Sequence, residues 1–267
     1  MSSTSVVLSI SILISGRQEM RRCLDSLSPF LEKIPCELIL VDTGCNEEQL
    51  AIAREYTDLI VPFTWCDDFS AARNEGLKRA RGEWFLYLDD DEWFEDPSEI
   101  VDFFLTGEYM GYECARYYVR NYIAGGGEKK PYSDGVVLRM VRLTPEIRFH
   151  GIVHEFLTPT YLPIKDFNTW VEHYGYFFDN DADQYKHVER NVSLLWKQLE
   201  MEPNVLHWYT QLIQEYMGIK EYARVLELCE KAFCIYDRLE TVDTAQLRSA
   251  GVLYSFGASA CLRKYDY

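Results

Sequence analysis

Apolar residues cluster in short runs along the first third of the chain, and stretches with helical spacing separate these runs. The runs are rich in β-branched residues and stop at turn residues such as Gly16 and Gly44. Such runs are typical of buried strands, and strands that alternate with helices form a parallel sheet with helices on both faces. We therefore predict an α/β fold. The expected strands cover residues 6–14, 37–42, 59–61 and 83–88, and the expected helices cover 20–27, 49–56 and 69–81.

After Tyr109 the pattern changes to a period of two. The runs Cys114–Tyr122 and Gly135–Leu143 alternate between apolar and polar residues. This alternation predicts antiparallel strands, and we expect them to be joined through Gly125–Gly127 and Pro131. The sheet is therefore expected to be mixed.

The last part of the chain has the pattern of a helical repeat. Apolar residues recur at helical spacing over 183–201, and from Tyr209 onward they fit a helix–turn–helix unit of tetratricopeptide type. A second unit begins near Thr244, and the sequence ends within it. Because roughly three units are needed to bury a repeat core, we expect a piece of a longer chain or a short tail that leans on the first domain. The predicted domains cover residues 1–178 and 179–267.

The last of the expected parallel strands runs into four consecutive carboxylates, Asp89–Glu92. Like charges this close raise one another's pKa values, and a hard divalent cation shared with a phosphate relieves the repulsion. Other polar residues follow the neighbouring strands, among them Ser15, Asp42 and Asp68. The carboxyl ends of parallel strands meet at one edge, where open α/β sheets bind ligands, so we expect a ligand site there. The simpler alternative is a solvated acidic turn.

Composition narrows the range of functions. The net charge of −16 argues against binding to nucleic acid or to an anionic membrane surface. Eight cysteines without metal-type spacing indicate reduced thiols. The apolar run 6–14 has neither a basic region before it nor a small-residue cleavage site after it, which predicts a strand and not a signal peptide. No run is long enough to span a bilayer, so we expect a soluble, cytoplasmic protein with no transmembrane segment.

Four short motifs follow one another in order. They are Val41–Gly44, Asp68–Gly76 with its Ala-Arg-Asn element, Leu88–Glu92 and Phe149–Glu155. In this order and spacing the chain resembles the family 2 glycosyltransferases, and most closely a bacterial branch that combines Phe-x-Gly-x-x-His-Glu with a helical repeat tail. The resemblance covers roughly residues 5–178. It implies a GT-A fold, a Rossmann-like mixed sheet flanked by helices that binds a nucleotide-sugar, with the acceptor site in its C-terminal half.

The resemblance also implies roles for individual residues. A nucleotide-sugar, expected to be UDP-linked, would be contacted at its base by Asp42. Asp91 would ligate Mn²⁺ or Mg²⁺ that bridges the diphosphate, because a cation neutralises this leaving group. Glu155 would take the proton of the acceptor, and His154 or His173 would add a metal or phosphate contact. The full expected set is Ser15, Asp42, Asp68, Arg73, Asp89 and Asp90 for the nucleotide, Asp89, Asp91 and His173 for the metal, and Glu155 as the base.

Alternatives stay open for several of these residues. Asp42 can cap a turn, Arg73 can be a surface residue paired with a carboxylate, and Glu155 can be an ordinary ion-paired carboxylate. The chain also departs from the family pattern after the first strand. Many relatives have Lys-Asn-Glu there, whereas this chain has Ser15–Glu19, in which Arg17 can replace the charge of the lysine.

Two functions of different class follow. The first is a metal-dependent, inverting glycosyltransferase that acts without a covalent intermediate on a peptide, protein or cell-surface glycan precursor. The second is a GT-A-like binding module that has lost transfer and docks a protein partner through its helical tail. The retained carboxylate cluster argues against the second function, because an inactive site has no need for a cluster that repels itself.

Overall fold

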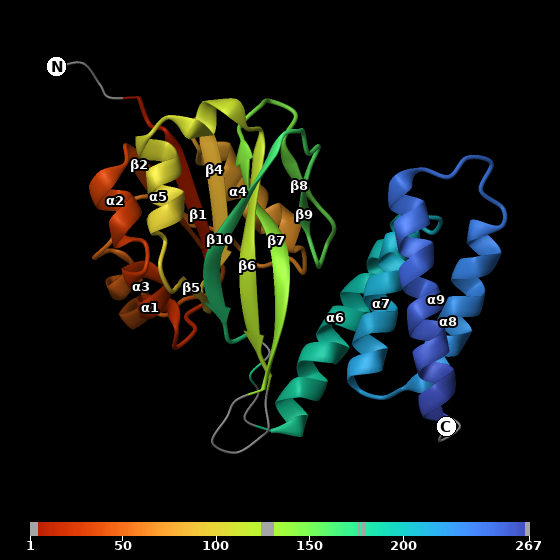
Figure 1. Ribbon diagram of the computed structural model, residues 1–267. Helices are drawn as coiled ribbons and strands as arrows, with labels where there is room; N and C mark the ends of the chain where they lie inside the picture. The colour runs from red at the N-terminus through yellow and green to blue at the C-terminus, as the bar shows by residue number, and fades with distance from the viewer. Residues whose placement is uncertain (1–4, 124–130, 176, 178–179, 265–267) are drawn as a thin grey trace. The chain divides into compact units, whose positions relative to one another are not determined.

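The chain forms two compact units in the computed structural model, which describes residues 5–123, 131–175, 177 and 180–264. The first unit comprises Met1–His150 and Glu155–Asp179, and the second comprises Gly151–His154 and Asn180–Tyr267. Four residues in the middle of the first unit's sequence therefore belong to the second unit, and the rest of the second unit begins at Asn180. Figure 1 shows the strands of the first unit and the helices of the second.

An eight-stranded mixed sheet forms the centre of the first unit, in the order β3-β2-β1-β4-β7-β6-β10-β5. The half that comes first in the chain is parallel, as its apolar runs predict, and the other half is mixed. The predicted α/β fold with a mixed sheet is confirmed. The parallel half consists of β1 (Leu8–Ile14), β2 (Cys36–Asp42), β3 (Ile60–Pro62) and β4 (Trp84–Asp89). The other half consists of β5 (Glu92–Phe94), β6 (Cys114–Tyr122), β7 (Tyr132–Arg142) and β10 (Ile164–His173).

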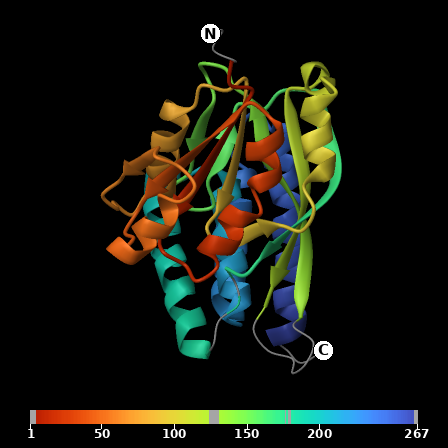
Figure 2. The same ribbon diagram turned by 90° about the vertical axis from the view of Figure 1, so that its left-hand side faces the viewer.

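Helices cover both faces of the parallel half, as predicted. Side chains from alternate positions of β1, such as Ile10 and Ile12, pack under the helices of one face, while Leu13 packs under α4 (Phe69–Arg79) on the other. Figure 2 views the molecule from the side on which red α1 and α2 and yellow α5 cover the sheet. The helices of that face are α1 (Met20–Asp25), α2 (Ser28–Lys33), α3 (Glu47–Ala53) and α5 (Ser98–Leu105), and the short 3₁₀ helix η1 (Glu108–Gly111) follows α5.

Local side-chain bonds fix where two of these helices begin. The side chain of Asn46 accepts a bond from the backbone N–H of Gln49, whose own side chain accepts from the N–H of Asn46, so a capping box opens α3. The side chain of Asp68 accepts from the N–H of Ala71 and caps α4. Both helices therefore start at cap residues that supply the missing acceptors for their first N–H groups.

Strands β6 and β7 are antiparallel, as their alternation predicts, but their register shifts once. Ala115 pairs with Met140 and Arg116 pairs with Leu138, so Arg139 is an extra residue in β7. Such a bulge re-aims the side chain that it carries and is common beside active sites. The connection predicted through Gly125–Gly127 lies outside the described residues.

Two further strands pack against the same face as α4. They are β8 (Arg148–His150) and β9 (Phe156–Thr158), which form an antiparallel pair. Phe149 and Leu157 of this pair are buried against Phe85 and Tyr87 of β4. The segment Phe149–Glu155, which the sequence marks as a motif, thus comprises the end of β8 and the connection to β9.

The second unit is an all-helical bundle. Its helices are α6 (Asp181–Met201), α7 (Leu206–Gly218), α8 (Tyr222–Tyr236) and α9 (Thr244–Lys264), and each packs on the next. Most of the apolar residues that show the repeat pattern from Tyr209 onward are buried, among them Tyr209, Leu212, Val225 and Cys229. No helix in the described part of the chain combines the length and the apolar character that a bilayer crossing requires.

Residues Gly151–His154 are part of this helical unit. The N–H of Ile152 donates to Oε1 of Gln198 at 2.8 Å, and Nε2 of His154 lies 3.0 Å from Oε1 of Glu215. Gly151 has a φ of +99°, and a Cβ at this position would meet the ring of Trp208 at 2.6 Å. Glycine is therefore required there both by the backbone and by the close approach of the tryptophan.

Candidate active site

The acidic cluster lies at the carboxyl end of β4, beside the end of β1. Asp90 accepts the backbone N–H of Ser15 at 2.7 Å and the hydroxyl of Ser15 at 3.2 Å. It also accepts the N–H of Arg17 at 3.3 Å. The structure thus brings together Ser15 and Asp90, both expected at the site, and uses the loop after β1 to hold the acidic turn in place.

Asp89 lies between two arginines, of which Arg73 is buried and Arg139 is partly buried. The guanidinium of Arg73 on α4 forms an ion pair with Asp89, and Nη2 of Arg139 lies 3.4 Å from Oδ2 of Asp89. Arg139 also pairs with Glu92 at 3.0 Å. Burial acts to raise the pKa of Asp89, but Arg73 and Arg139 outweigh it and hold this pKa well below its usual range. Asp89 is therefore ionised and locked in place.

Both arginines lie over the ring of Tyr87, with their guanidinium carbons 4.8 Å (Arg73) and 4.4 Å (Arg139) from its centroid. Such stacking adds to the electrostatic attraction that keeps a buried guanidinium in position. Sequence reasoning missed Arg139. The one available signal is a lone charge inside the apolar run Val136–Val141, and the bulge that directs it toward Asp89 becomes visible only in the paired strands.

Glu155 reaches the same cluster through Arg73. Nε of Arg73 forms an ion pair with Oε1 of Glu155, whose side chain is only 10% exposed. Arg73 itself is 3% exposed, so the alternative of a surface arginine is wrong. The expected base is thus an ion-paired carboxylate close to the acidic edge, and the geometry is compatible with both of the roles considered for it.

Asp91 faces His173, which is the last residue of β10. Nε2 of His173 lies 3.6 Å from Oδ1 of Asp91, and Nε of Arg17 lies 3.7 Å from Oδ2. Oδ1 of Asp91 is buried and accepts no hydrogen bond from the described residues. Burial and the charge of Asp89 raise the pKa of Asp91 well above its usual range, and burial lowers the pKa of His173.

The charges of the cluster leave room for a cation. Five carboxylates, those of Asp89–Glu92 and Glu155, face the guanidinium groups of Arg17, Arg73 and Arg139. No group of three or more His, Cys, Asp or Glu side chains within the described residues is arranged to hold a metal ion. Asp91 and His173 can supply two ligands. These are one carboxylate oxygen and one imidazole nitrogen, and a hard divalent cation held by few protein ligands completes its coordination with substrate phosphates and water.

Asp42 ends a strand and shapes a local turn, whereas Asp68 caps the helix α4. Asp42 is the last residue of β2 and pairs in register with Ile14 of β1, so it belongs to the same edge as Ser15. Its Oδ1 accepts the N–H groups of Gly44 at 3.0 Å and Cys45 at 2.8 Å. Asp42 therefore does cap a turn, and its contact to a nucleotide base stays a prediction.

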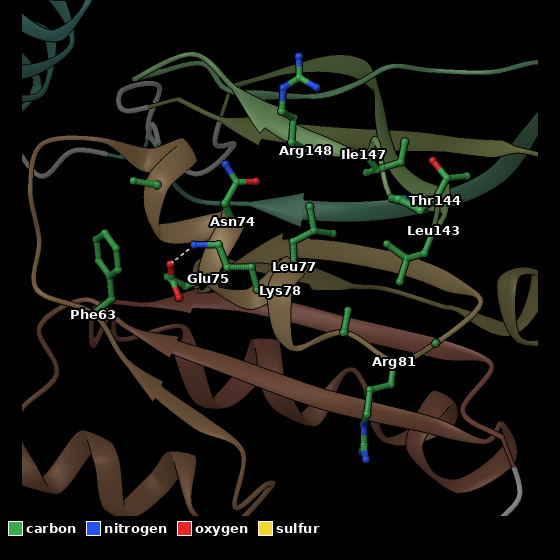
Figure 3. A pocket seen from close by; sticks show the side chains of 14 residues that line it. Phe63, Asn74, Glu75, Leu77, Lys78, Arg81, Leu143, Thr144, Ile147 and Arg148 are labelled. Carbon is green, nitrogen blue, oxygen red and sulfur yellow. Dashed lines mark hydrogen bonds and ion pairs between the residues drawn. The ribbon is translucent and has the colours of Figure 1, made fainter.

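A separate groove of about 790 Å³ lies beside α4 (Figure 3). Its apolar floor includes Leu77 and Ile147, and Lys78 and Arg148 lie on its rim. Gly82, which also lines it, precedes β4, whereas Asp89 ends that strand. The groove is therefore at the opposite end of β4 from the acidic cluster.

Comparison with known proteins agrees with the class that the mixed sheet and its acidic edge suggest. The model of the family described as glycosyl transferase family 2 matches residues 12–147, and the chain belongs to this family. The matched region includes Asp42, Arg73 and the cluster Asp89–Glu92.

Individual relatives extend this picture. The chain is 31% identical over 186 residues to a TPR repeat-containing protein of Synechococcus elongatus, covering 63% of this chain and 42% of the relative. It is 26% identical over 215 residues to the SPbeta prophage-derived glycosyltransferase SunS of Bacillus subtilis, covering 78% of this chain and 48% of SunS. The chain thus spans less than half the length of these two relatives. A crystal structure of S. aureus TarS 1–349 superposes with a TM-score of 0.48 and 11% identity over 98% of this chain and 92% of that one.

Proposed function

We propose that the chain is a glycosyltransferase that moves a sugar from a nucleotide-sugar, UDP-linked in our proposal, to an acceptor. The observation that carries the proposal is the buried Oδ1 of Asp91, which accepts no hydrogen bond from the described residues and lies opposite His173 at the acidic edge of a family 2 domain. A buried carboxylate oxygen without a donor costs free energy unless a ligand compensates it. A divalent cation that arrives with a diphosphate is such a ligand.

Asp91 and His173 would hold Mn²⁺ or Mg²⁺, which neutralises the charge that develops on the diphosphate leaving group. Asp89 is already paired with Arg73 and Arg139, so its proposed contribution is to anchor the turn that presents Asp91. Ser15, Asp42, Asp68 and Asp90 line the edge at which we place the nucleotide. Ser15, Asp42 and Asp90 already fix loops or turns there, and Asp68 caps α4.

The acceptor needs a base, and we assign this role to Glu155. The nucleophilic group of the acceptor attacks the anomeric carbon as the bond to the diphosphate breaks, and its proton passes to the carboxylate of Glu155. A single displacement of this kind inverts the anomeric carbon. Arg73 pairs with Glu155 and so orients it relative to Asp89.

A nucleotide screen tests the donor and the metal together. Purified protein is heated with UDP, GDP, CDP or dTDP in Mn²⁺, Mg²⁺ or EDTA. A ligand at about a hundredfold excess over its dissociation constant stabilises the native state by about 2.7 kcal/mol. We expect a rise in melting temperature with UDP and Mn²⁺ that disappears in EDTA and in Asp91→Ala. Metal-dependent UDP binding by Asp91→Ala at the wild-type level would contradict the proposal.

A protein-binding role of the helical unit is the second candidate. Leu247 and Tyr254 lie two turns apart on α9 and are 59% and 63% exposed. Exposed apolar side chains on one face of a helix favour a protein contact. Replacement of both by serine is expected to abolish capture of a protein acceptor or partner without altering nucleotide binding, which a pull-down and the thermal screen would measure.

A further inference from the structure

His173 is held by a neighbour that the sequence does not single out. Asn121 is the register partner of His173 across the parallel pair β6 and β10. Oδ1 of Asn121 lies 2.7 Å from Nδ1 of His173. Because the two side chains stand at the same level of adjacent strands, the backbone pairing itself brings them together.

The orientation of the Asn121 amide is fixed from the other side. Its Nδ2 donates to the backbone carbonyl of Ser133 on β7 at 3.3 Å. Oδ1 therefore points to His173, and an amide oxygen can only accept a hydrogen bond. The proton of a neutral His173 must then lie on Nδ1, which leaves the lone pair of Nε2 directed away from Asn121.

That lone pair lies on the side of Asp91. Nε2 is 3.6 Å from Oδ1 of Asp91, the buried oxygen that accepts no hydrogen bond from the described residues. Two acceptor atoms at this separation repel each other unless a positive charge lies between them. Metal-binding histidines almost always donate their second ring N–H to an oxygen acceptor in this way.

Gly175 keeps the adjacent space open. A Cβ at this position would lie 2.3 Å from Nε2 of His173 and 3.0 Å from Oδ2 of Asp91. The φ of Gly175 is not in the left-handed region, whereas Gly16, Gly44, Gly107 and Gly151 have such φ values among the described glycines. The backbone thus permits alanine at 175. A side chain is excluded only because it would occupy the space beside the two candidate ligands.

We propose that Asn121 and Gly175 are positioning residues of a divalent-cation site formed by Asp91 and His173. Asn121 selects the His173 tautomer that can bind a cation, and Gly175 leaves the volume in which the cation is bound. The inference rests on the proposed function, because that function requires the cation.

Titration of the full chain with MnCl₂, alone and with UDP, tests the role of Asn121. Bound Mn²⁺ is read by electron paramagnetic resonance. Loss of an outer hydrogen-bond partner typically weakens metal binding by about 10- to 100-fold, and we expect this loss in Asn121→Leu. Asn121→Asp retains an acceptor and should stay within a few-fold of the wild type. Asn168→Leu makes the same change at an exposed position of β10 and should have no effect.

Nitrogen chemical shifts of His173 in the metal-free protein give a second readout. We expect the Nδ1–H form in the wild type and a shift toward the Nε2–H form in Asn121→Leu. A wild-type His173 in the Nε2–H form, or unchanged Mn²⁺ affinity in Asn121→Leu, would overturn the role of Asn121.

Gly175→Ala tests the open space. We expect at least a tenfold loss of Mn²⁺ affinity, because the added methyl group must displace the His173 ring. The melting temperature in EDTA reports whether the fold is retained, and wild-type affinity would refute this part. His173→Ala separates the two levels of the argument. If it binds Mn²⁺ and UDP like the wild type, the proposed metal site itself is wrong; if it loses Mn²⁺ while Asn121→Leu and Gly175→Ala do not, only the present inference fails.

Discussion

Ser9 near the amino end of strand β1 and Ser15 just after its carboxyl end each donate a hydrogen bond to a carboxylate. The two carboxylate sites differ in how many hydrogen-bond donors and positive charges surround them. At the amino end, the hydroxyl of Ser9 donates to Glu37 at 2.7 Å and accepts the N–H of Gly82 at 2.8 Å. Arg81 donates to Glu37 through its backbone N–H and its guanidinium, at 2.7 Å in each case. Burial acts to raise the pKa of Glu37, but these donors outweigh it and lower the pKa.

At the carboxyl end, the carboxylates outnumber the cations. Ser15 donates to Asp90, but Asp91 has a buried oxygen with no donor among the described residues, and the pKa of each of the two aspartates is raised. The comparison shows how the two kinds of charged site differ. A carboxylate with a full set of donors stabilises the fold by itself, whereas one without them is stable only with a ligand.

Removal of Arg139 should cause the largest loss of stability, because it takes a positive charge from a cluster in which negative charges are already in excess. Arg139→Met keeps much of the apolar stem but leaves Asp89 and Glu92 with one fewer partner in a buried setting. Breaking a buried pair in this way costs about 3–5 kcal/mol, which urea denaturation would measure. Exposed Arg148→Met is the control. A loss below about 1 kcal/mol would mean that Arg139 is not needed to balance the cluster.

Glu37→Gln should have the next largest effect, at the amino end. Hydrogen bonds to charged groups contribute about 1.5–3 kcal/mol, so we expect a loss of stability in this range at pH 7. The folded pKa of Glu37 is lowered from 4.5, so its contribution is present above that pH and is lost as the pH falls through the folded value. The wild type and Glu37→Gln should therefore converge in acid. A difference that stays constant between pH 7 and pH 3 would contradict this explanation.

Asp91→Asn should change stability least within the two clusters, despite the burial of the side chain. Removing the charge relieves repulsion from Asp89, and the new amide can donate to His173. In EDTA we expect the free energy of unfolding to stay within about 0.5 kcal/mol of the wild type or to rise. A large loss of stability would show that Asp91 is structural, like Glu37, and would remove the contrast between the two ends.

Glu55→Gln supplies the lower limit of the series. Glu55 pairs with Arg21 at 2.8 Å, but both side chains are about half exposed, at 54% and 47%. Exposed pairs of this kind contribute little because water screens them. We expect no measurable change in melting temperature, and a clear decrease would indicate that pairing geometry and not burial separates Glu37 from the surface pairs.

Part of this arrangement can be read from the sequence, because part of it is local. The strands β1, β2 and β4 are continuous apolar runs that end at Gly or Asp, and strand ends in a parallel sheet meet at one edge by geometry. The acidic edge and the nearness of Ser15 to Asp90 follow from that. Asp68 is found equally well, since a cap lies next to its helix.

The remaining features depend on pairing between distant segments. Helix α5 is different, because it was not expected although Asp96 and Pro97 stand directly before it as a helix-start signal. Nothing local indicates that β10 runs parallel to β6 or that β7 contains a bulge at Arg139. Asn121 and Gly175 gain their meaning only from that pairing, because each meets His173 in space.

The four residues Gly151–His154 limit how the two units can be exchanged. They sit between β8 and β9, yet their partners Gln198, Trp208 and Glu215 belong to the helices. A domain boundary placed at Asn180 therefore separates this tetrapeptide from the helices on which it packs. If the helices were replaced by those of another protein, Ile152 and His154 would lose their hydrogen-bond partners. We expect recombination between relatives to succeed only when this tetrapeptide is exchanged together with the helices, so the motif Phe149–Glu155 and the tail should be inherited as a pair.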